Sequence, residues 1–300
     1  MKVIKLSLLV FICLALCCER SPENNWPKYK TSPSVSEKVY CFAVHPLHNP
    51  AKLTAVYQPL MDYLNKKFVD VRFELESSRD YANFEGKIKA RKPEFILPNP
   101  WQTLEAMKVG YKVIAMAGDK NDFKGIFIVR KNSGIKEPAD LKGKSVSYPS
   151  PTALAACIMP QYFLYLHGIN VMKEIKNVYV GSQESSIMNV YLNKTAAGAT
   201  WPPPWRAFQK TNPKEASEMY VIWETPYLIN NSVMAKGDIP IKIIDQLCSF
   251  LFQLRDTQEG RKILSDMETA GFYAATDNDY DIVKSYIIEF EKKVRKVINK

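Results

Sequence analysis

Four short stretches of the sequence share a pattern that suits anion binding. Each leads from a largely apolar segment into an Asn or a Ser, and a proline follows in three of them: Asn49-Pro50, Asn99-Pro100, Ser150-Pro151 and, without the proline, Ser182. Asn and Ser are favoured as helix N-caps, and Pro is favoured at the first helical position. A helix start offers unpaired backbone N–H groups and the positive end of the helix dipole. The four turns therefore predict helix starts that could hold a small oxyanion or carboxylate.

Polar and aromatic side chains near these turns complete the set of candidate ligand-binding residues. In the first half of the chain the candidates are His45, Asn49, Asn99 and Trp101, and in the second half they are Tyr148, Ser150, Thr152, Ala153, Ser182, Gln183 and Trp201. Hydroxyl, amide and main-chain donors would fix an anionic group, and aromatic rings would hold an organic remainder. Aromatic faces also attract cations, so a cationic ligand stays open. The stretch "ATWPPPWRAF" cannot be a strand interior and predicts a stiff loop, either a packed corner or a ligand wall.

The same residues do not assemble a catalytic or metal site. His45 and His48 form an HxxH pair, but zinc needs three or four ligands, and no acidic or cysteine side chain flanks the pair. The GxSxG, P-loop and GxGxxG motifs are absent from the strand–helix turns. We therefore expect a binding protein with no catalytic residues, no metal and no cofactor.

Strands and helices must alternate to position these turns. Apolar spacing predicts strands at 39–44, 69–76, 95–97 and 113–117, and helices over 53–64, 81–91 and 101–109. After an extended segment at 122–131, strands are expected at 145–148, 177–180, 197–200 and 219–223, and helices at 152–167, 183–192 and 204–210. The tail reads as three amphipathic helices over 241–255, 258–267 and 279–297. Such alternation is typical of mostly parallel sheets with right-handed crossovers.

The predicted architecture is α/β with two lobes joined by two extended crossings, near 122–131 and 225–236. Lobe one comprises 39–121 and 236–300, and lobe two comprises 122–235. In open parallel sheets, ligands bind at the carboxyl ends of the strands. The capped turns of the two lobes should therefore face each other across a ligand cleft.

The N-terminal segment indicates export. Lys2 and Lys5 precede the apolar run 6–16, which is too short to span a bilayer and has the length of a signal-peptide core. It resembles a bacterial lipoprotein signal, with Cys18, or Cys17, as the lipidated residue; an ordinary cleaved signal is the alternative. Residues 1–17 are then the signal peptide, and the polar residues 18–38 form a flexible tether. We expect a membrane-anchored lipoprotein of the periplasm or cell envelope.

Charge and cysteine content exclude other classes. The formal net charge is +10, but the basic residues are scattered and form no stripe, which argues against a nucleic-acid partner. Beyond the signal, only Cys41, Cys157 and Cys248 remain, which is not a disulfide framework. We expect a monomer.

Several stretches resemble the periplasmic binding components of phosphate, phosphite and phosphonate ABC importers, a branch of the type II periplasmic binding proteins. The resemblance covers most of 39–297 and rests on "HPLHNPAKLTAVYQPLMDYLNKKF", "FIVRKNSGIKEPADLKGKSVSYPSP" and "YVGSQESSIMNVYL". It implies a two-lobed fold that closes on a small ligand and is then recognised by an ABC permease. A sensor role, in which the closed protein docks on a membrane signalling receptor, is the alternative. An enzyme of this fold, such as a thiamin-pyrimidine synthase relative, would carry a cysteine-rich motif that is absent here.

The ligand-binding positions depart from the family pattern. The Ser-Thr-Ser run of phosphonate-binding members is matched by Thr152-Ala153-Leu154-Ala155, and the family's histidine at the next helix start is matched by Gln183. Backbone N–H groups would therefore replace most of the hydroxyl donors. The expected ligand is a phosphonate-like or other small organic anion.

Overall fold

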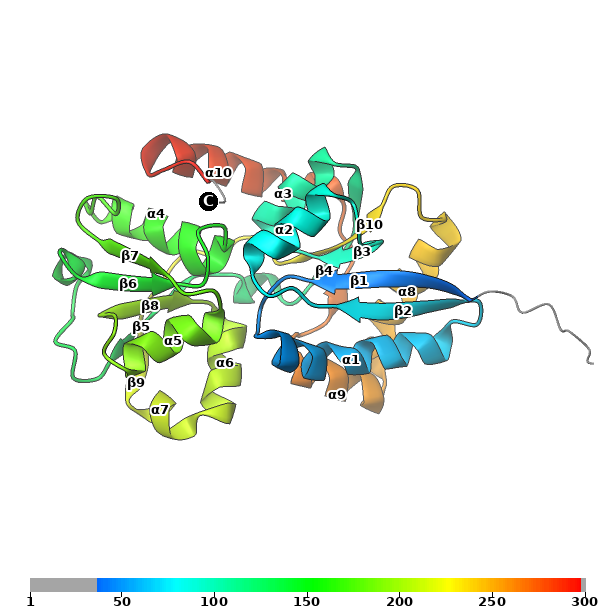
Figure 1. Cartoon of the computed structure of the whole chain (residues 1–300), viewed down its shortest axis with the longest axis horizontal. Helices are drawn as coiled ribbons and strands as arrows, with labels where there is room; N and C mark the ends of the chain where they lie inside the picture. The colour runs from blue at the N-terminus through cyan, green and yellow to red at the C-terminus, as the bar shows by residue number, and fades with distance from the viewer. Residues whose placement is uncertain (1–36, 298–300) are drawn as a thin grey trace, which may run out of the picture. The chain divides into compact units, whose positions relative to one another are not determined.

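The computed structural model of this chain describes residues 37–297 (Figure 1). The predicted signal peptide, the lipidation candidates Cys17 and Cys18, and the predicted tether up to residue 36 lie outside the described residues. Lys38, which the sequence assigns to the tether, already begins the first strand. Within 37–297, no helix is both long enough and apolar enough to cross a membrane.

The described strands form two sheets. The first has the order β11-β4-β10-β3-β1-β2 and the second has the order β7-β6-β8-β5-β9. The strands of the first sheet are β1 (Lys38–Val44), β2 (Val71–Glu76), β3 (Phe95–Leu97), β4 (Tyr111–Ala117), β10 (Ser232–Lys236) and β11 (Phe272–Tyr273). Those of the second are β5 (Ile126–Arg130), β6 (Ser145–Tyr148), β7 (Lys176–Tyr179), β8 (Ala197–Thr200) and β9 (Met219–Glu224). Both sheets are mixed: β1 is parallel to β2 and β3, and β6 is parallel to β7 and β8, whereas β10 and β5 run antiparallel to their neighbours.

Helices flank both sheets, as the alternating pattern predicts (Figure 1). Around the first sheet are α1 (Pro50–Lys67), α2 (Tyr81–Lys89), α3 (Pro100–Lys108), α8 (Ile241–Gln253), α9 (Gln258–Asp266) and α10 (Asp281–Lys293). Around the second are α4 (Met159–Leu166), α5 (Gln183–Tyr191), α6 (Pro202–Thr211) and α7 (Pro213–Ser217). Short 3₁₀ turns lie at Lys120–Asp122, Pro138–Leu141, Leu254–Asp256 and Asp277–Tyr280, and one π turn lies at Leu154–Ile158.

Helix α1 shows how the sequence pattern produces these elements. Asn49 caps it by accepting a hydrogen bond from the Lys52 backbone N–H at 3.0 Å. Leu53, Tyr57 and Leu60 are buried at helical spacing and pack into the core of the first lobe. This face anchors the helix against β2 and thereby fixes where its N-terminal turn lies.

The two crossings end in strands inside the sheets. The predicted lobe boundary at 235 cuts β10, which pairs with β3 and β4 in the first sheet, so that sheet begins again at Ser232. The run "SVMAK" is short and has three consecutive apolar residues, so it shows no strand alternation, which is why the sequence indicated only an extended segment. The tail, which the sequence assigns to lobe one, also reaches lobe two: Arg295, beyond α10, donates hydrogen bonds to Gln161 Oε1 at 2.8 Å and to the Pro151 carbonyl at 2.7 Å.

The helix predicted at 152–167 starts two residues later and in an unusual form. Its first turn is the π turn Leu154–Ile158, in which the Ile158 N–H reaches back five residues to the Ala153 carbonyl at 3.1 Å. Pro160 lacks an N–H and its ring clashes with an ordinary helical turn, so the wider turn relieves the conflict. Gly125 of the first crossing packs against this turn, where a Cβ would lie 2.5 Å from the Ala155 carbonyl oxygen.

Candidate functional site

A small hollow between the lobes is lined by residues from both lobes. The space between its walls is about 210 Å³, part of it open to solvent, so the hollow is small. We call it the first hollow. Its lining consists of His45, Tyr81, Asn99, Phe123, Ala153, Leu154, Ala155, Ala156, Gln183, Trp201 and Asn231.

The helix start at Leu154 forms one wall of the first hollow. Ala153 is extended, with φ −71° and ψ 102°, and the helical turn begins at the next residue. The first backbone N–H groups of a helix have no partner within it, and they lie at the positive end of the dipole. The alanines at 153, 155 and 156 have side chains too small to cover this backbone. The wall therefore presents main-chain donors to the hollow, an arrangement that binds anions.

Gln183 is held in place from both lobes. Its Nε2 donates to the Tyr81 hydroxyl at 3.1 Å, and its Oε1 accepts from Thr200 Oγ1 at 2.8 Å. Because the Tyr81 oxygen accepts from Gln183, the Tyr81 hydroxyl proton remains available to a ligand. Burial raises the Tyr81 pKa, so this hydroxyl keeps its proton at neutral pH.

Asn99 joins the two lobes directly. Its Oδ1 accepts from the backbone N–H of Trp101 at 3.0 Å and of Gln102 at 3.1 Å, which caps α3 as the sequence predicts. Its Nδ2 donates across the interface to the Thr152 carbonyl at 3.3 Å. The predicted encounter of the Asn99 and Ser150-Pro151-Thr152 turns is therefore present in the structure.

A buried carboxyl group lies behind this contact. Thr152 Oγ1 donates to Glu85 Oε1 at 2.6 Å, and Gln102 Nε2 donates to the same oxygen at 3.0 Å. Glu85 is 4% exposed, and burial raises its pKa from 4.5 to about 7 despite these hydrogen bonds. The two lobes thus meet through a carboxyl group that titrates near neutral pH.

His45 lines the first hollow without contributing charge. Its Nδ1 donates to the Leu97 carbonyl at 2.8 Å, and burial lowers its pKa to about 4. The ring is therefore neutral at pH 7. None of the described lining residues of the first hollow is Lys, Arg, Asp or Glu, so a bound anion would be held by neutral donors alone.

Two aromatic rings, those of Phe123 in the first crossing and of Trp201, line the first hollow. The Phe123 and Trp201 ring centroids are 5.5 Å apart, with an interplanar angle of 58°. Trp201 comes from the second lobe, at the junction of β8 and α6, yet it is buried against the core of the first lobe. The stiff loop predicted for "ATWPPPWRAF" is wrong: β8 runs to Thr200 and α6 begins at Pro202, because proline is tolerated in the first turn of a helix. Trp201, between them, is a wall of the hollow.

The predicted candidates divide into three groups. Those that line the first hollow are His45, Asn99, Ala153, Gln183 and Trp201. Thr152 and Trp101 lie immediately behind the lining, where Thr152 contacts Glu85 and Trp101 packs in the first turn of α3. The residues that lie outside it are Asn49, Tyr148, Ser150 and Ser182.

Each of the four outlying residues has a local physical reason for its position. Asn49 is exposed, and its side chain is used in capping α1. Ser182 likewise caps α5, accepting from the Ser185 N–H at 3.1 Å. Ser150 Oγ lies 3.0 Å from Thr152 Oγ1, and Tyr148 packs on Tyr179 with ring centroids 6.0 Å apart.

Sequence reasoning missed several lining residues. These are Tyr81, Phe123, Leu154, Ala155, Ala156 and Asn231, with Glu85 just behind them. Tyr81 follows the cap Asp80 at the start of α2, so the cap pattern that located Asn99 could also have located it. Asn231 and Phe123 lie in the two crossings, where no periodic pattern of apolar residues shows which side chains line the hollow.

Comparisons with known proteins identify the family of the chain. The family described as "ABC transporter, phosphonate, periplasmic substrate-binding protein" matches residues 42–280. A probable ABC transporter phosphite-binding protein, PhnD1 of Prochlorococcus marinus, is 28% identical over 198 residues, which is 62% of this chain and 65% of the relative.

Two solved structures show the same fold. PhnD1 of Prochlorococcus marinus in complex with methylphosphonate superposes with a TM-score of 0.78 at 21% identity, over 85% of this chain and 99% of that one. A binding-protein component of an ABC phosphonate transporter from Pseudomonas aeruginosa gives 0.79 at 16% identity, over 86% and 88%. The predicted two-lobed type II binding-protein fold is thereby confirmed. With a family match that spans most of the described residues, the chain belongs to the phosphonate-binding family of periplasmic substrate-binding proteins of ABC transporters.

Proposed function

We propose that this protein is the solute-binding component of an ABC importer and that it closes on a small oxyanion of the phosphonate or phosphite class. The observation that carries the proposal is the helix start at Leu154, which opens onto the first hollow between two lobes in contact. Helix N–H groups, the Tyr81 hydroxyl and the second amide protons of Asn99 and Gln183 would surround the anion. We keep the division into two lobes, with 122–231 as lobe two.

The energy of such a site is sufficient without a cationic side chain. A hydrogen bond to a charged group contributes about 1.5–3 kcal/mol. Three or four of them contribute about 5–12 kcal/mol in total. This range includes the roughly 8 kcal/mol of a micromolar complex, and aromatic contacts from Phe123 and Trp201 would offset part of the cost of ordering. The family's hydroxyl donors are then dispensable because the backbone supplies the contacts.

A ligand screen on the purified full chain tests the proposal. We expect phosphite or methylphosphonate to raise the melting temperature and to bind by isothermal titration calorimetry, whereas choline and other quaternary amines do not. Stabilisation by quaternary amines alone would contradict the anion proposal and would favour a cation held by the aromatic rings. Binding of none of these compounds would exclude the proposed ligand class.

We also propose that Cys18, or Cys17, carries a lipid that tethers the protein to the cell-envelope membrane. The support is the sequence pattern of the N-terminal segment. In a detergent phase-partition assay, Cys18→Ser should move the protein from the detergent phase to the aqueous phase, with Cys17→Ser as the matched comparison. Retention of both variants in the detergent phase would argue against lipidation at this pair.

A further inference from the structure

A guanidinium group lies behind the helix start at Leu154. Arg295 follows α10, which packs in the core of the first lobe, yet its side chain reaches the second lobe. Its Nη2 donates to the Pro151 carbonyl at 2.7 Å and contacts Cys157 Sγ at 3.5 Å. Pro151 precedes the helix start and Cys157 lies in its first turn. Arg295 therefore contacts this segment both before and after Leu154.

The guanidinium of Arg295 contacts neutral groups and no carboxylate within the described chain. Its Nε donates to Gln161 Oε1 at 2.8 Å, and its Nη1 donates to the Lys296 carbonyl at 3.1 Å. Its central carbon lies 5.3 Å from the centroid of the Phe290 ring. The side chain is half-buried, so water compensates its charge only in part. A positive charge in this position is stabilised when an anion binds nearby.

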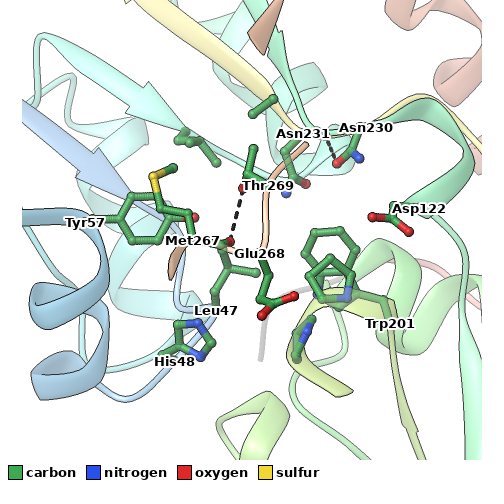
Figure 2. Close-up of a pocket in the computed structure, with 15 residues that line it drawn as sticks. Leu47, His48, Tyr57, Asp122, Trp201, Asn230, Asn231, Met267, Glu268 and Thr269 are labelled. Carbon is green, nitrogen blue, oxygen red and sulfur yellow. Dashed lines mark hydrogen bonds between the residues drawn. The ribbon is translucent and has the colours of Figure 1, made fainter. Parts of the chain in front are cut away.

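The two other half-buried arginines of the described chain each pair with a carboxylate. Arg206 contacts Asp122 at 2.9 Å and Glu268 at 3.0 Å, and both carboxylates line a second small hollow, shown in Figure 2. Arg130 pairs with Glu218. The guanidinium behind the helix start is therefore the exception among the three.

The position of this charge favours an anion in the first hollow. Residues 153–156 line the hollow, whereas Pro151 and Cys157, which Arg295 contacts, do not. The guanidinium and a bound anion would thus lie on opposite sides of the turn, about one helix diameter or roughly 10 Å apart. Residues 153–159 are all buried, so salt screens this interaction little. The charge already acts inside the turn: burial raises the pKa of Cys157 to about 11, and Arg295 opposes this rise.

We propose that Arg295 strengthens anion binding at the Leu154 helix start as a specificity-determining charge that acts through the turn without contacting the ligand. This inference rests on the proposed function and supplies the positive charge that the lining of the first hollow lacks. It also gives the segment after α10, which belongs to the first lobe, a role in the second lobe's half of the site.

Calorimetry with methylphosphonate on full-length variants tests the role of the charge. Arg295→Met should bind about 4- to 16-fold more weakly than the parent, the effect of a unit charge roughly 10 Å away at an effective dielectric constant of about 20–40. Arg295→Lys keeps the charge but loses the planar fork, and it should stay within about threefold of the parent. If Arg295→Met fails to fold, Arg295→Gln replaces it, since it keeps a hydrogen-bond donor without the charge.

Arg255→Met is the matched control. Arg255 also has no carboxylate partner within the described chain, lies 5.8 Å from an aromatic ring, that of Tyr273, and does not line the first hollow. We expect it to keep the parent affinity. Parent-like affinity in the uncharged Arg295 variant overturns the inference, and so does an equal loss in Arg295→Lys, which would assign the effect to geometry. Absence of binding in the parent contradicts the proposed function itself.

A second change cancels the charge while keeping Arg295. Because Gln161 Oε1 accepts a hydrogen bond from Arg295, the carboxylate of Gln161→Glu would pair with the guanidinium. We expect methylphosphonate affinity to fall by a factor similar to that of Arg295→Met. Parent-like affinity in Gln161→Glu overturns the inference.

Discussion

Two helix starts from the same lobe border the interlobe space, and they are opposite in chemistry. The turn at Leu154 is built from small residues and exposes backbone N–H groups, whereas α6 begins with three consecutive prolines that have none. Both follow a strand of the second sheet, so strand–helix topology alone does not make an anion site. The residue types in the first helical turn therefore determine which of two similar strand–helix turns can bind an anion.

The lobes also meet differently beside these two helix starts. Near Leu154, the contact is the buried Glu85–Thr152 hydrogen bond with Asn99 beside it. Near α6, it is the partly exposed Arg206–Glu268 ion pair. The first contact should respond to pH, and the second to salt.

The largest expected effect comes from placing a negative charge beside the Leu154 helix start. In Gln183→Glu, a carboxylate would lie roughly 5 Å from a bound anion, and their repulsion is about 3 kcal/mol at an effective dielectric constant of about 20. We expect methylphosphonate affinity, measured by calorimetry, to fall about 100-fold or more. Gln161→Glu is the matched control, because Gln161 is equally buried in the same lobe but contacts Arg295 and does not line the first hollow. Equal losses in both variants would mean that Gln183 does not face the ligand.

The buried contact should make stability depend on pH through Glu85. Because its pKa is raised from 4.5 to about 7, the folded protein holds a proton that the unfolded chain releases between these values. The free energy of unfolding should therefore fall as pH rises from about 4.5 to about 7, by up to about 3 kcal/mol. Glu85→Gln keeps the oxygen that Thr152 and Gln102 contact and should remove this dependence in denaturant titrations at pH 5 and pH 8. A slope identical to that of the parent would assign the titration to another group.

The role of the backbone N–H groups at Leu154 can be tested by introducing a proline there, as at the start of α6. Leu154→Pro removes an N–H at the first helical position, and the extended Ala153 before it is compatible with proline. Leu154→Ala loses the same side chain but keeps the N–H. If this N–H contacts the anion, Leu154→Pro should bind methylphosphonate about tenfold or more weakly than Leu154→Ala, since a charge-assisted hydrogen bond contributes about 1.5–3 kcal/mol. Equal affinities would place the anion elsewhere.

The sequence predicted the parts of this site that follow local rules. The caps at Asn99 and Ser182 and the strands at 95–97, 145–148 and 197–200 are local features, and each is found where the pattern placed it. Which capped turn faces the ligand is a tertiary question. Asn49 follows the same cap rule as Asn99, but it is exposed and does not line the first hollow.

Other parts of the site could not have been read from local pattern. Glu85 lies mid-helix in α2, and its contact with Thr152 from the other lobe makes it part of the interface. Asn231 precedes β10, a short strand that the sequence indicated only as an extended segment. Its buried Oδ1 has no hydrogen-bond partner in the described chain, and this depends on the position of β10 between β3 and β4, which local pattern does not give. Neither helix and strand propensity nor the periodicity of apolar residues identifies a residue whose role depends on partners distant in the sequence.

The smallest expected effect concerns the ion pairs beside α6. Glu268→Gln removes the charge that Arg206 and Lys210 share across the lobes, but the basic partners are substantially exposed, and such pairs contribute about 0.2–1 kcal/mol. We expect methylphosphonate affinity to fall two- to fivefold at low salt, and the difference from the parent to shrink at about 0.5 M salt because screening weakens the parent's pairs. Lys262→Gln, which breaks an exposed pair within α9 alone, is the control and should change affinity at neither salt concentration. A salt-independent loss in Glu268→Gln would mean that its carboxylate acts through packing between the lobes and not through its charge.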